Sequence, residues 1–248
     1  MKKNFILSCA LGCVVLSGAV YAEQKKESVH EKDTALELAT YSTEQIEPLL
    51  PLLETWVRRE FCQYPYLWLA TQEGYSLSNV LLISEKESLV TVVRKGQEVV
   101  GVAAGVPFDS ELLKVYLECD GISVHASLME KMKENGFDPS NIFYMNYFLT
   151  APEYRNDKDL VDLIYNRYVD FVRKIGKTQL CYFEDPGQLD HPLRPEHPTP
   201  IEPWGHAIQG FRHMHIQADF SWPTAQLDGS AKDAVHAVDF FIKDISEL

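Results

Sequence analysis

The sequence predicts a single-domain α+β fold built around one mixed, mostly antiparallel sheet that is flanked by helices. The first observation is the order of its segments: strand-like and amphipathic helical stretches alternate, and the last two stretches are both strand-like. The second is size. The chain has 248 residues, of which 46% are hydrophobic, and no shift in composition marks a second domain.

The first half of the domain contains a predicted strand, helix and hairpin. Residues 36–41 alternate like a strand, and residues 42–57 have an apolar helical face behind a capping sequence that starts at Ser42. An aromatic-rich loop follows over residues 61–69. Residues 88–94 and 98–106 are predicted strands, and the intervening Lys95-Gly96-Gln97 indicates a hairpin.

The second half is dominated by a strand, a turn and a helix over residues 141–176. Residues 141–151 are β-branched and aromatic, and Pro152 ends the strand because proline cannot donate to a sheet ladder. An amphipathic helix follows the turn, with Gly176 as its expected C-cap. Residues 109–136 are expected to be helical in pieces, and residues 208–211 to end a helix. Residues 179–184, 213–222 and 235–242 are predicted strands.

The N-terminus resembles an export signal. Lys2 and Lys3 precede a mostly apolar run over residues 5–20, and Val20-Tyr21-Ala22 fits a signal-peptidase site. We therefore expect a signal peptide over residues 1–22, a flexible linker over residues 23–34 and the folded domain over residues 35–248, in a periplasmic or secreted protein without membrane contact. A single uncleaved membrane anchor is the alternative.

Charge and cysteine content narrow the possible partners. The formal net charge of −13 argues against nucleic acid and anionic membranes, and it leaves a cationic acceptor such as an amine open. Cys62, Cys119 and Cys181 are too few and too widely spaced for a disulfide framework, although one bridge is possible. Cys181 is interpreted as a small core residue. The sequence leaves a monomer and a homodimer equally open.

The turn after Pro152 is expected to bind an anion, because the backbone N–H groups at the N-terminus of the following helix are directed at the turn. This unit resembles the GNAT acyltransferase superfamily, which binds the pyrophosphate of coenzyme A there. Further blocks in the same order strengthen the resemblance to one GNAT subgroup. They are residues 64–68, 100–108, 143–144, 152–155, 191–195, 210–211, 220–223 and 238–243.

The resemblance implies a splayed parallel strand pair and acyl transfer from acetyl-CoA, or a similar thioester, to a small-molecule or peptide amine. The implied cofactor-binding residues are Phe148, Leu149 and Thr150 on the splayed strand, and Arg155, Asn156, Lys158, Asp159 and Leu160 at the pyrophosphate turn. The implied catalytic residues are His206, where the family often has a tyrosine acid, and Tyr147, where the subgroup has a glutamate. Glu60, Tyr64 and Tyr66 are expected to shape the acceptor pocket.

Departures from the family pattern support a second hypothesis. Lys158 and Leu160 stand at the family's glycine positions, and Asp157 and Asp159 bring negative charge to the proposed phosphate site. An export signal also separates the protein from cytoplasmic acyl-CoA. The alternative function is therefore an exported, non-catalytic binding module with a GNAT fold.

Two further patterns are interpreted without assigning them a ligand. His213 and His215 share one face if their segment is a strand, and Glu184, Asp185 or Asp190 could join them in a zinc site. No familiar metal-ligand spacing supports such a site, so no metal is predicted. The Gly101-x-x-x-Gly105 spacing is interpreted as sheet packing.

Overall fold

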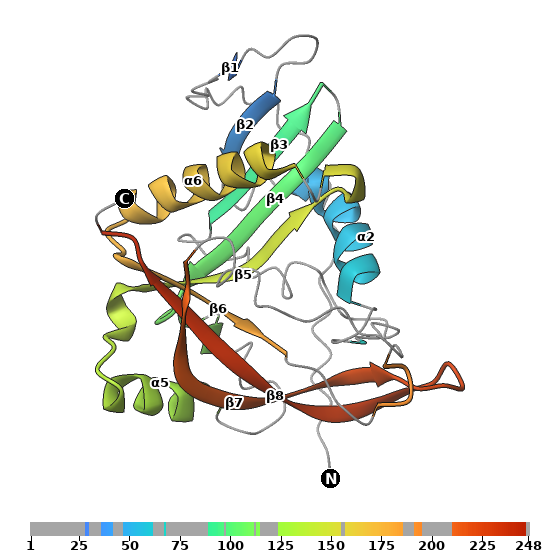
Figure 1. The fold of residues 1–248 in the computed structure, drawn as a ribbon, viewed down its shortest axis with the longest axis vertical. Coiled ribbons are helices and arrows are strands. Elements are labelled where there is room, and N and C mark those ends of the chain that lie inside the picture. Colours follow the sequence, from blue (N-terminus) through green and yellow to red (C-terminus); the bar gives the residue numbers. More distant parts are fainter. Residues whose placement is uncertain are drawn as a thin grey trace, which may run out of the picture.

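A computed structural model shows one eight-stranded sheet with helices on both of its faces (Figure 1). It describes residues 28–29, 36–41, 47–61, 67, 89–96, 98–111, 113–114, 124–154, 157–185, 191–194 and 210–246. The strands are β1 (Ser28–Val29), β2 (Leu36–Tyr41), β3 (Leu89–Lys95), β4 (Glu98–Pro107), β5 (Ile142–Thr150), β6 (Gln179–Glu184), β7 (Arg212–Ala225) and β8 (Ala231–Asp244). The helices are α2 (Leu50–Phe61), α5 (Val124–Glu134) and α6 (Lys158–Lys174), with 3-10 turns η1 (Glu47–Leu49), η2 (Pro139–Asn141) and η3 (Pro152–Tyr154).

The strand order is β1-β2-β3-β4-β5-β6-β8-β7. Among the described strands, β5 and β6 are parallel neighbours and the other adjacent pairs are antiparallel. The predicted α+β class and the mostly antiparallel sheet are thus confirmed. None of the helices in the described ranges is long and apolar enough to cross a bilayer.

Several element boundaries differ from those expected. The helix predicted over residues 42–57 continues to Phe61, because Arg58, Arg59 and Glu60 are good helix formers. Between residues 109 and 136 the long described helix is α5 alone. The last two strands are longer than predicted, since hairpin pairing extends through Ala225 and Ala231. Two residues of the expected linker, Ser28 and Val29, pair with β2, and the expected signal peptide lies outside the described residues.

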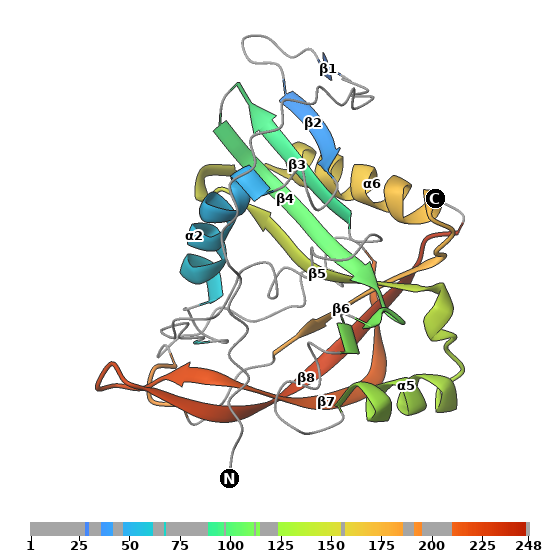
Figure 2. The ribbon, with the colours of Figure 1, turned by 180° about the vertical axis from the view of Figure 1, so that it is seen from behind.

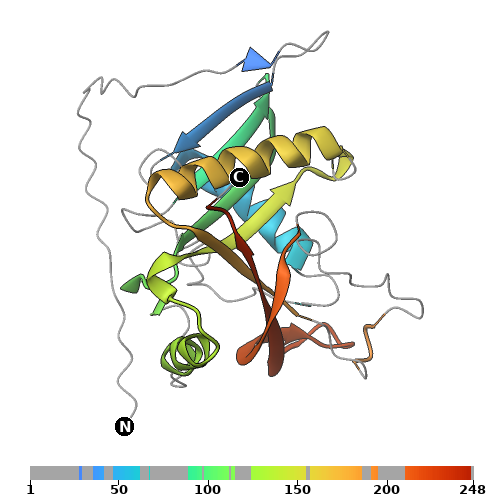
Figure 3. The ribbon, with the colours of Figure 1, turned by 60° about the vertical axis from the view of Figure 1, so that its left-hand side comes forward.

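Three apolar clusters divide the core between the two faces of the sheet. The long helix α6 covers one face, where Ile164, Tyr168 and Val172 pack on β3 to β6. Seen from behind in Figure 2, α2 covers the opposite face with Leu53 and Trp56. The second half of that face is covered by α5. Figure 3 shows α6 crossing the strands, with its N-terminal end beside the end of β5.

Helix α6 ends as predicted. Gly176 has a φ of +82°, and its N–H donates to the carbonyl of Arg173 at 2.9 Å. The N–H of Lys177 donates to the carbonyl of Val172 at 3.3 Å. These two bonds form a Schellman motif, which favours glycine at the left-handed position.

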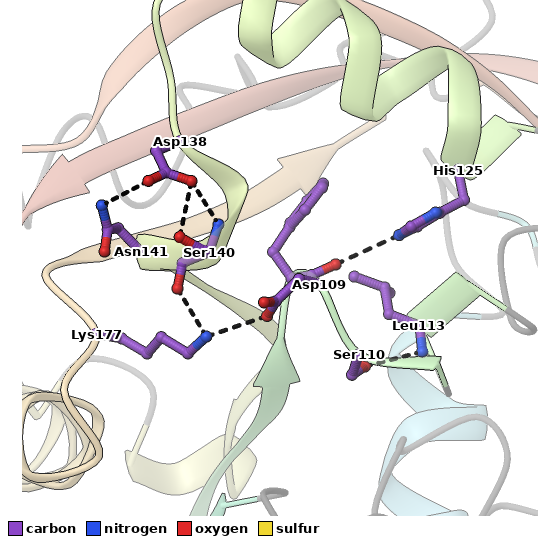
Figure 4. Close-up of polar contacts among 9 residues, drawn as sticks. Asp109, Ser110, Leu113, His125, Asp138, Ser140, Asn141 and Lys177 are labelled. Carbon is purple, nitrogen blue, oxygen red and sulfur yellow. Dashed lines mark hydrogen bonds and ion pairs between the residues drawn. The ribbon is translucent and has the colours of Figure 1, made fainter.

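The start of the parallel strand pair is held by a polar network (Figure 4). Lys177, just before β6, donates from Nζ to Asp109 Oδ1 at 3.0 Å and to the Ser140 carbonyl at 2.8 Å. Asp138 accepts the Ser140 N–H at 3.0 Å and the Ser140 hydroxyl at 2.8 Å, and it also accepts from Asn141 Nδ2 at 3.2 Å. These two hydrogen bonds from Ser140 lower the pKa of Asp138, the side-chain bond more than the backbone one. The network fixes where β5 and β6 begin side by side.

Candidate functional site

The candidate site lies where β5 and β6 separate. Their ladder contains three residue pairs and ends at Tyr144 and Cys181. Beyond them β5 continues to Thr150 and β6 to Glu184, and Figures 1 and 2 show the two strands diverging. The predicted splayed pair is therefore present. Beyond Tyr144 and Cys181 the two strands no longer pair, which leaves a wedge-shaped opening in the hydrogen-bond ladder of the sheet.

The narrow end of the wedge is apolar and inert. The rings of Tyr144 and Phe183 stack across it, with centroids 6.0 Å apart. Cys181 is free and fully buried, and burial raises the pKa of its thiol. A fully buried thiol with a raised pKa is a poor nucleophile, so Cys181 is the core residue that the sequence suggests.

A β-bulge turns the backbone of β5 at the same place. Ala104 pairs with Tyr147, but Gly105 pairs with Met145, so Asn146 is an extra residue in β5. Without this bulge Tyr147 would share the α6 face with Met145. With it, Tyr147 lies on the α2 face, 6% exposed and packed in the cluster of Leu53 and Trp56. Bulges of this kind often redirect groups beside active sites.

The glycines of β4 allow the close packing around this bulge. A Cβ on Gly105 would collide with the Tyr144 carbonyl and the Tyr168 hydroxyl, and one on Gly101 would collide with Ile164. The Gly101-x-x-x-Gly105 spacing is thus a packing feature, as predicted.

The N-terminus of α6 supplies the second part of the site. The chain turns from β5 through η3, where the Tyr154 N–H donates to the Ala151 carbonyl at 2.9 Å and the Asp157 N–H to the Tyr154 carbonyl at 3.0 Å. Asp157 is the N-cap of α6, and its carboxylate accepts the Leu160 N–H at 3.0 Å. One of the N–H groups that could hold an anion is therefore occupied by the protein's own carboxylate.

The predicted cofactor residues are divided between these two parts of the site. Phe148, Leu149 and Thr150 are half-buried on the diverging part of β5; Phe148 packs on the α6 side and Leu149 on the α2 side. Lys158 and Asp159 are exposed in the first turn of α6. Leu160 is 2% exposed and packs in the core beneath α6, so its side chain faces away from the turn.

Other predicted site residues are not placed. Arg155, Asn156, Tyr64, Tyr66 and His206 lie outside the described residues, and Glu60 is described only as a backbone position in α2.

One buried series of hydrogen-bonded side chains was not predicted from the sequence. Asp185, directly after β6, accepts from His236 Nδ1 at 2.7 Å, and His236 Nε2 lies 2.9 Å from the Thr224 hydroxyl oxygen. The ring of Trp222 stacks on His236 with centroids 3.6 Å apart. These contacts tie the β7–β8 hairpin to the end of β6. Only a contact map could reveal them, since the three polar residues are far apart in sequence.

No protein-family model matches the chain, and no curated protein matches its sequence. Solved structures do resemble it, and GNAT proteins are among them. FeeM, an N-acyl amino acid synthase from uncultured soil microbes, is 7% identical with a TM-score of 0.50, over 87% of this chain and 93% of that one. The chain has the GNAT fold.

Two other solved structures give lower scores. The ribosomal-protein-S18-alanine N-acetyltransferase of Escherichia coli is 11% identical with a TM-score of 0.46, over 86% of this chain and 96% of that one. The yncA protein of Salmonella typhimurium, solved with its cofactor acetyl-CoA, is 12% identical with a TM-score of 0.42, over 86% and 95%.

Proposed function

We propose that this protein is an exported N-acyltransferase, which moves an acetyl or other acyl group from acyl-CoA to a small-molecule or peptide amine. The observation that carries the proposal is the opening between β5 and β6, directly before the N-terminus of α6. An extended pantetheine arm fits such an opening because a strand edge can bind it through backbone hydrogen bonds. The proposed location is the periplasm or the extracellular space, after cleavage before Glu23, as monomer or homodimer.

In the proposed reaction the neutral amine nitrogen attacks the thioester carbonyl and the C–S bond breaks. The nitrogen gives up one proton as the amide forms, and the leaving thiolate takes up one proton. The enzyme contributes position and a backbone donor for the developing oxyanion, for which β5 beside its bulge is the natural source. Tyr147 and His206 are the proposed proton-handling side chains, and Glu60, Tyr64 and Tyr66 the proposed acceptor pocket. An acidic pocket suits a cationic amine, and so does the net charge.

Lys158 and Arg155 are proposed to face the pyrophosphate, with the N–H groups of Asn156, Lys158 and Asp159 beside them. Leu160 stands at a glycine position of the family, and its side chain packs in the core. Phe148, Leu149 and Thr150 are proposed to line the pantetheine arm. The carboxylates of Asp157 and Asp159 oppose this binding, because they compete with phosphate for the same helix terminus.

The decisive test is a thermal-shift titration with acetyl-CoA, coenzyme A and pantetheine. A ligand that binds the native state raises the melting temperature with dose. Pantetheine tests the strand opening alone, since it lacks the pyrophosphate. Release of free thiol in the presence of amines then tests the chemistry. Mass measurement of the exported chain tests whether it begins at Glu23.

Asp157→Asn separates the two parts of the site. Asparagine caps a helix about as well as aspartate, so folding is retained, while one negative charge leaves the helix terminus. We expect acetyl-CoA to bind about two- to fivefold more tightly, which corresponds to about 0.4–1 kcal/mol. Pantetheine binding should stay unchanged. Asp170→Asn, an exposed position later on the same helix, is the matched control for net charge.

A second candidate function is a non-catalytic binding module. It is favoured by the Asp157 carboxylate, which occupies the Leu160 N–H at 3.0 Å. In this case neither the natural protein nor Asp157→Asn is stabilised by any of the three ligands. That result, with both proteins folded, would reject the acyltransferase.

A further inference from the structure

A large irregularity in the pairing of β7 with β8 brings the side chains of His213 and His215 together. His213 pairs with Phe241 and Gln217 pairs with Asp239, so four steps along β7 match two steps along β8. Met214 and Ile216 in this irregular stretch are buried, whereas His215 is exposed with a φ of +59°. A left-handed backbone is strained for histidine, and such strain persists where the surroundings impose it, often at functional sites.

The two imidazoles converge on one point. The Nδ1 atoms of His213 and His215 are hydrogen-bonded at 3.3 Å, a contact that a shared metal ion would replace, and the rings lie at 79° with centroids 4.9 Å apart. Two nitrogens bound to a tetrahedral Zn²⁺ at about 2.0–2.1 Å lie about 3.3–3.4 Å from each other. A square-planar ion would need about 2.8–3.0 Å, so this separation favours zinc geometry.

Asp239 orients the first of these rings. Its Oδ1 lies 3.3 Å from His213 Nε2 and accepts Gln217 Nε2 at 2.8 Å. A proton on Nε2 fits this carboxylate and leaves the Nδ1 lone pair directed at His215. A carboxylate behind a ligating imidazole is a recurring feature of metal sites. The Nδ1 of His213 also accepts the backbone N–H of His215 at 3.1 Å, a bond that an incoming metal ion would replace.

The histidines open into a hollow of about 440 Å³ between α5 and β7, so water can complete the coordination of an ion. It is lined by Lys131, Asn135, His213, His215, Ile216 and Gln217. Lys131 donates from Nζ to the Gln217 carbonyl at 2.7 Å and places a positive charge on the rim. That charge opposes a cation and limits its affinity.

We propose that His213 and His215 bind a tetrahedral transition-metal ion, with Zn²⁺ the best fit, and that Asp239 is the positioning residue behind His213. Within the described ranges no group of three or more His, Cys, Asp or Glu side chains is placed to hold a metal. The site therefore has two protein ligands and exchangeable outer positions. It does not depend on acyl transfer.

The test is Zn²⁺ binding by the tag-free protein in competition with a chromophoric chelator, together with histidine ring NMR. We expect one Zn²⁺ per chain, with perturbation of Nδ1 in two rings. His215→Asn keeps a residue that tolerates the left-handed backbone, and His213→Gln removes the other ligand; each should weaken binding at least about tenfold. Asp239→Asn should weaken it about tenfold.

Two controls address other sources of binding. His197→Asn removes a histidine that is not one of the proposed ligands and should leave the affinity unchanged. Lys131→Gln removes the opposing charge and should strengthen binding. The proposal is overturned if the natural protein binds less than one Zn²⁺ per chain at saturation, if a double variant at positions 213 and 215 retains it, or if Mg²⁺ competes equally.

Discussion

Gly105→Ala is expected to destabilise this protein strongly. A Cβ there would collide with the Tyr144 carbonyl and the Tyr168 hydroxyl, and it would lie 3.0 Å from Met145 Cα. Two of these neighbours are backbone atoms of β5, at the place where its bulge begins, and Tyr168 is fully buried. The two backbone atoms cannot withdraw without moving the strand, and the buried Tyr168 ring has little room to shift, so we expect a loss of about 3 kcal/mol or more in the free energy of unfolding.

Two other glycines provide matched comparisons. At Gly101 the new Cβ would meet mainly the end of the Ile164 side chain, which can change rotamer, so we expect a loss of about 1–2 kcal/mol. At Gly96 nothing lies within 4 Å, but φ is +62°, and a left-handed alanine costs about 1–2 kcal/mol. Urea unfolding measures all three through the midpoint at constant m-value. If Gly105→Ala loses no more than Gly101→Ala, the close packing of β4 on β5 is incorrect.

Three further predictions concern polar contacts and a cap. His236→Ala removes the imidazole that meets Asp185 at 2.7 Å in the core, and we expect urea unfolding to show a loss of about 3–5 kcal/mol in the free energy of unfolding. A small loss would mean that this pair does not stabilise the fold. Gly176→Ala, at a φ of +82°, should cost about 1–2 kcal/mol in the same assay, as at Gly96; no change would argue against the Schellman motif. Because the pKa of Asp138 is lowered in the folded protein, its stabilising effect is present above the pKa of the unfolded state and is lost as the pH falls through the folded pKa. Asp138→Asn should therefore flatten the acid side of the stability–pH curve, and an unchanged curve would contradict this.

Elements with a clear period could be predicted from the sequence. Residues 36–41 and 179–184 are strands with the predicted limits, and the amphipathic helix ends at Lys174, with the expected Gly176 just after its cap. The bulge at Asn146 could not be predicted, because it is a difference in register between β4 and β5 and leaves no mark on alternation within one strand. Tyr147 shows the consequence: its place on the α2 face depends on that single extra residue.

The histidine pair shows a similar limit. Strand alternation correctly places His213 and His215 on one face. Their acidic neighbour is Asp239 on the adjacent strand, whereas Asp185, considered as a zinc ligand from sequence proximity, instead binds His236. Sequence distance cannot identify a cross-strand neighbour, since pairing between β7 and β8 sets it.

At the proposed pyrophosphate turn, the structure changes which residue is expected to oppose phosphate binding. From the sequence, Lys158 and Leu160 are the departures that weigh against coenzyme A, because side chains replace glycines that let phosphate approach. In the fold the Leu160 side chain is 2% exposed and packs in the core, so it faces away from the start of α6. Its N–H, however, is held at 3.0 Å by Asp157. The obstacle to an anion is therefore a carboxylate that competes for a donor, and the change most able to restore phosphate binding is at position 157, not at either former glycine.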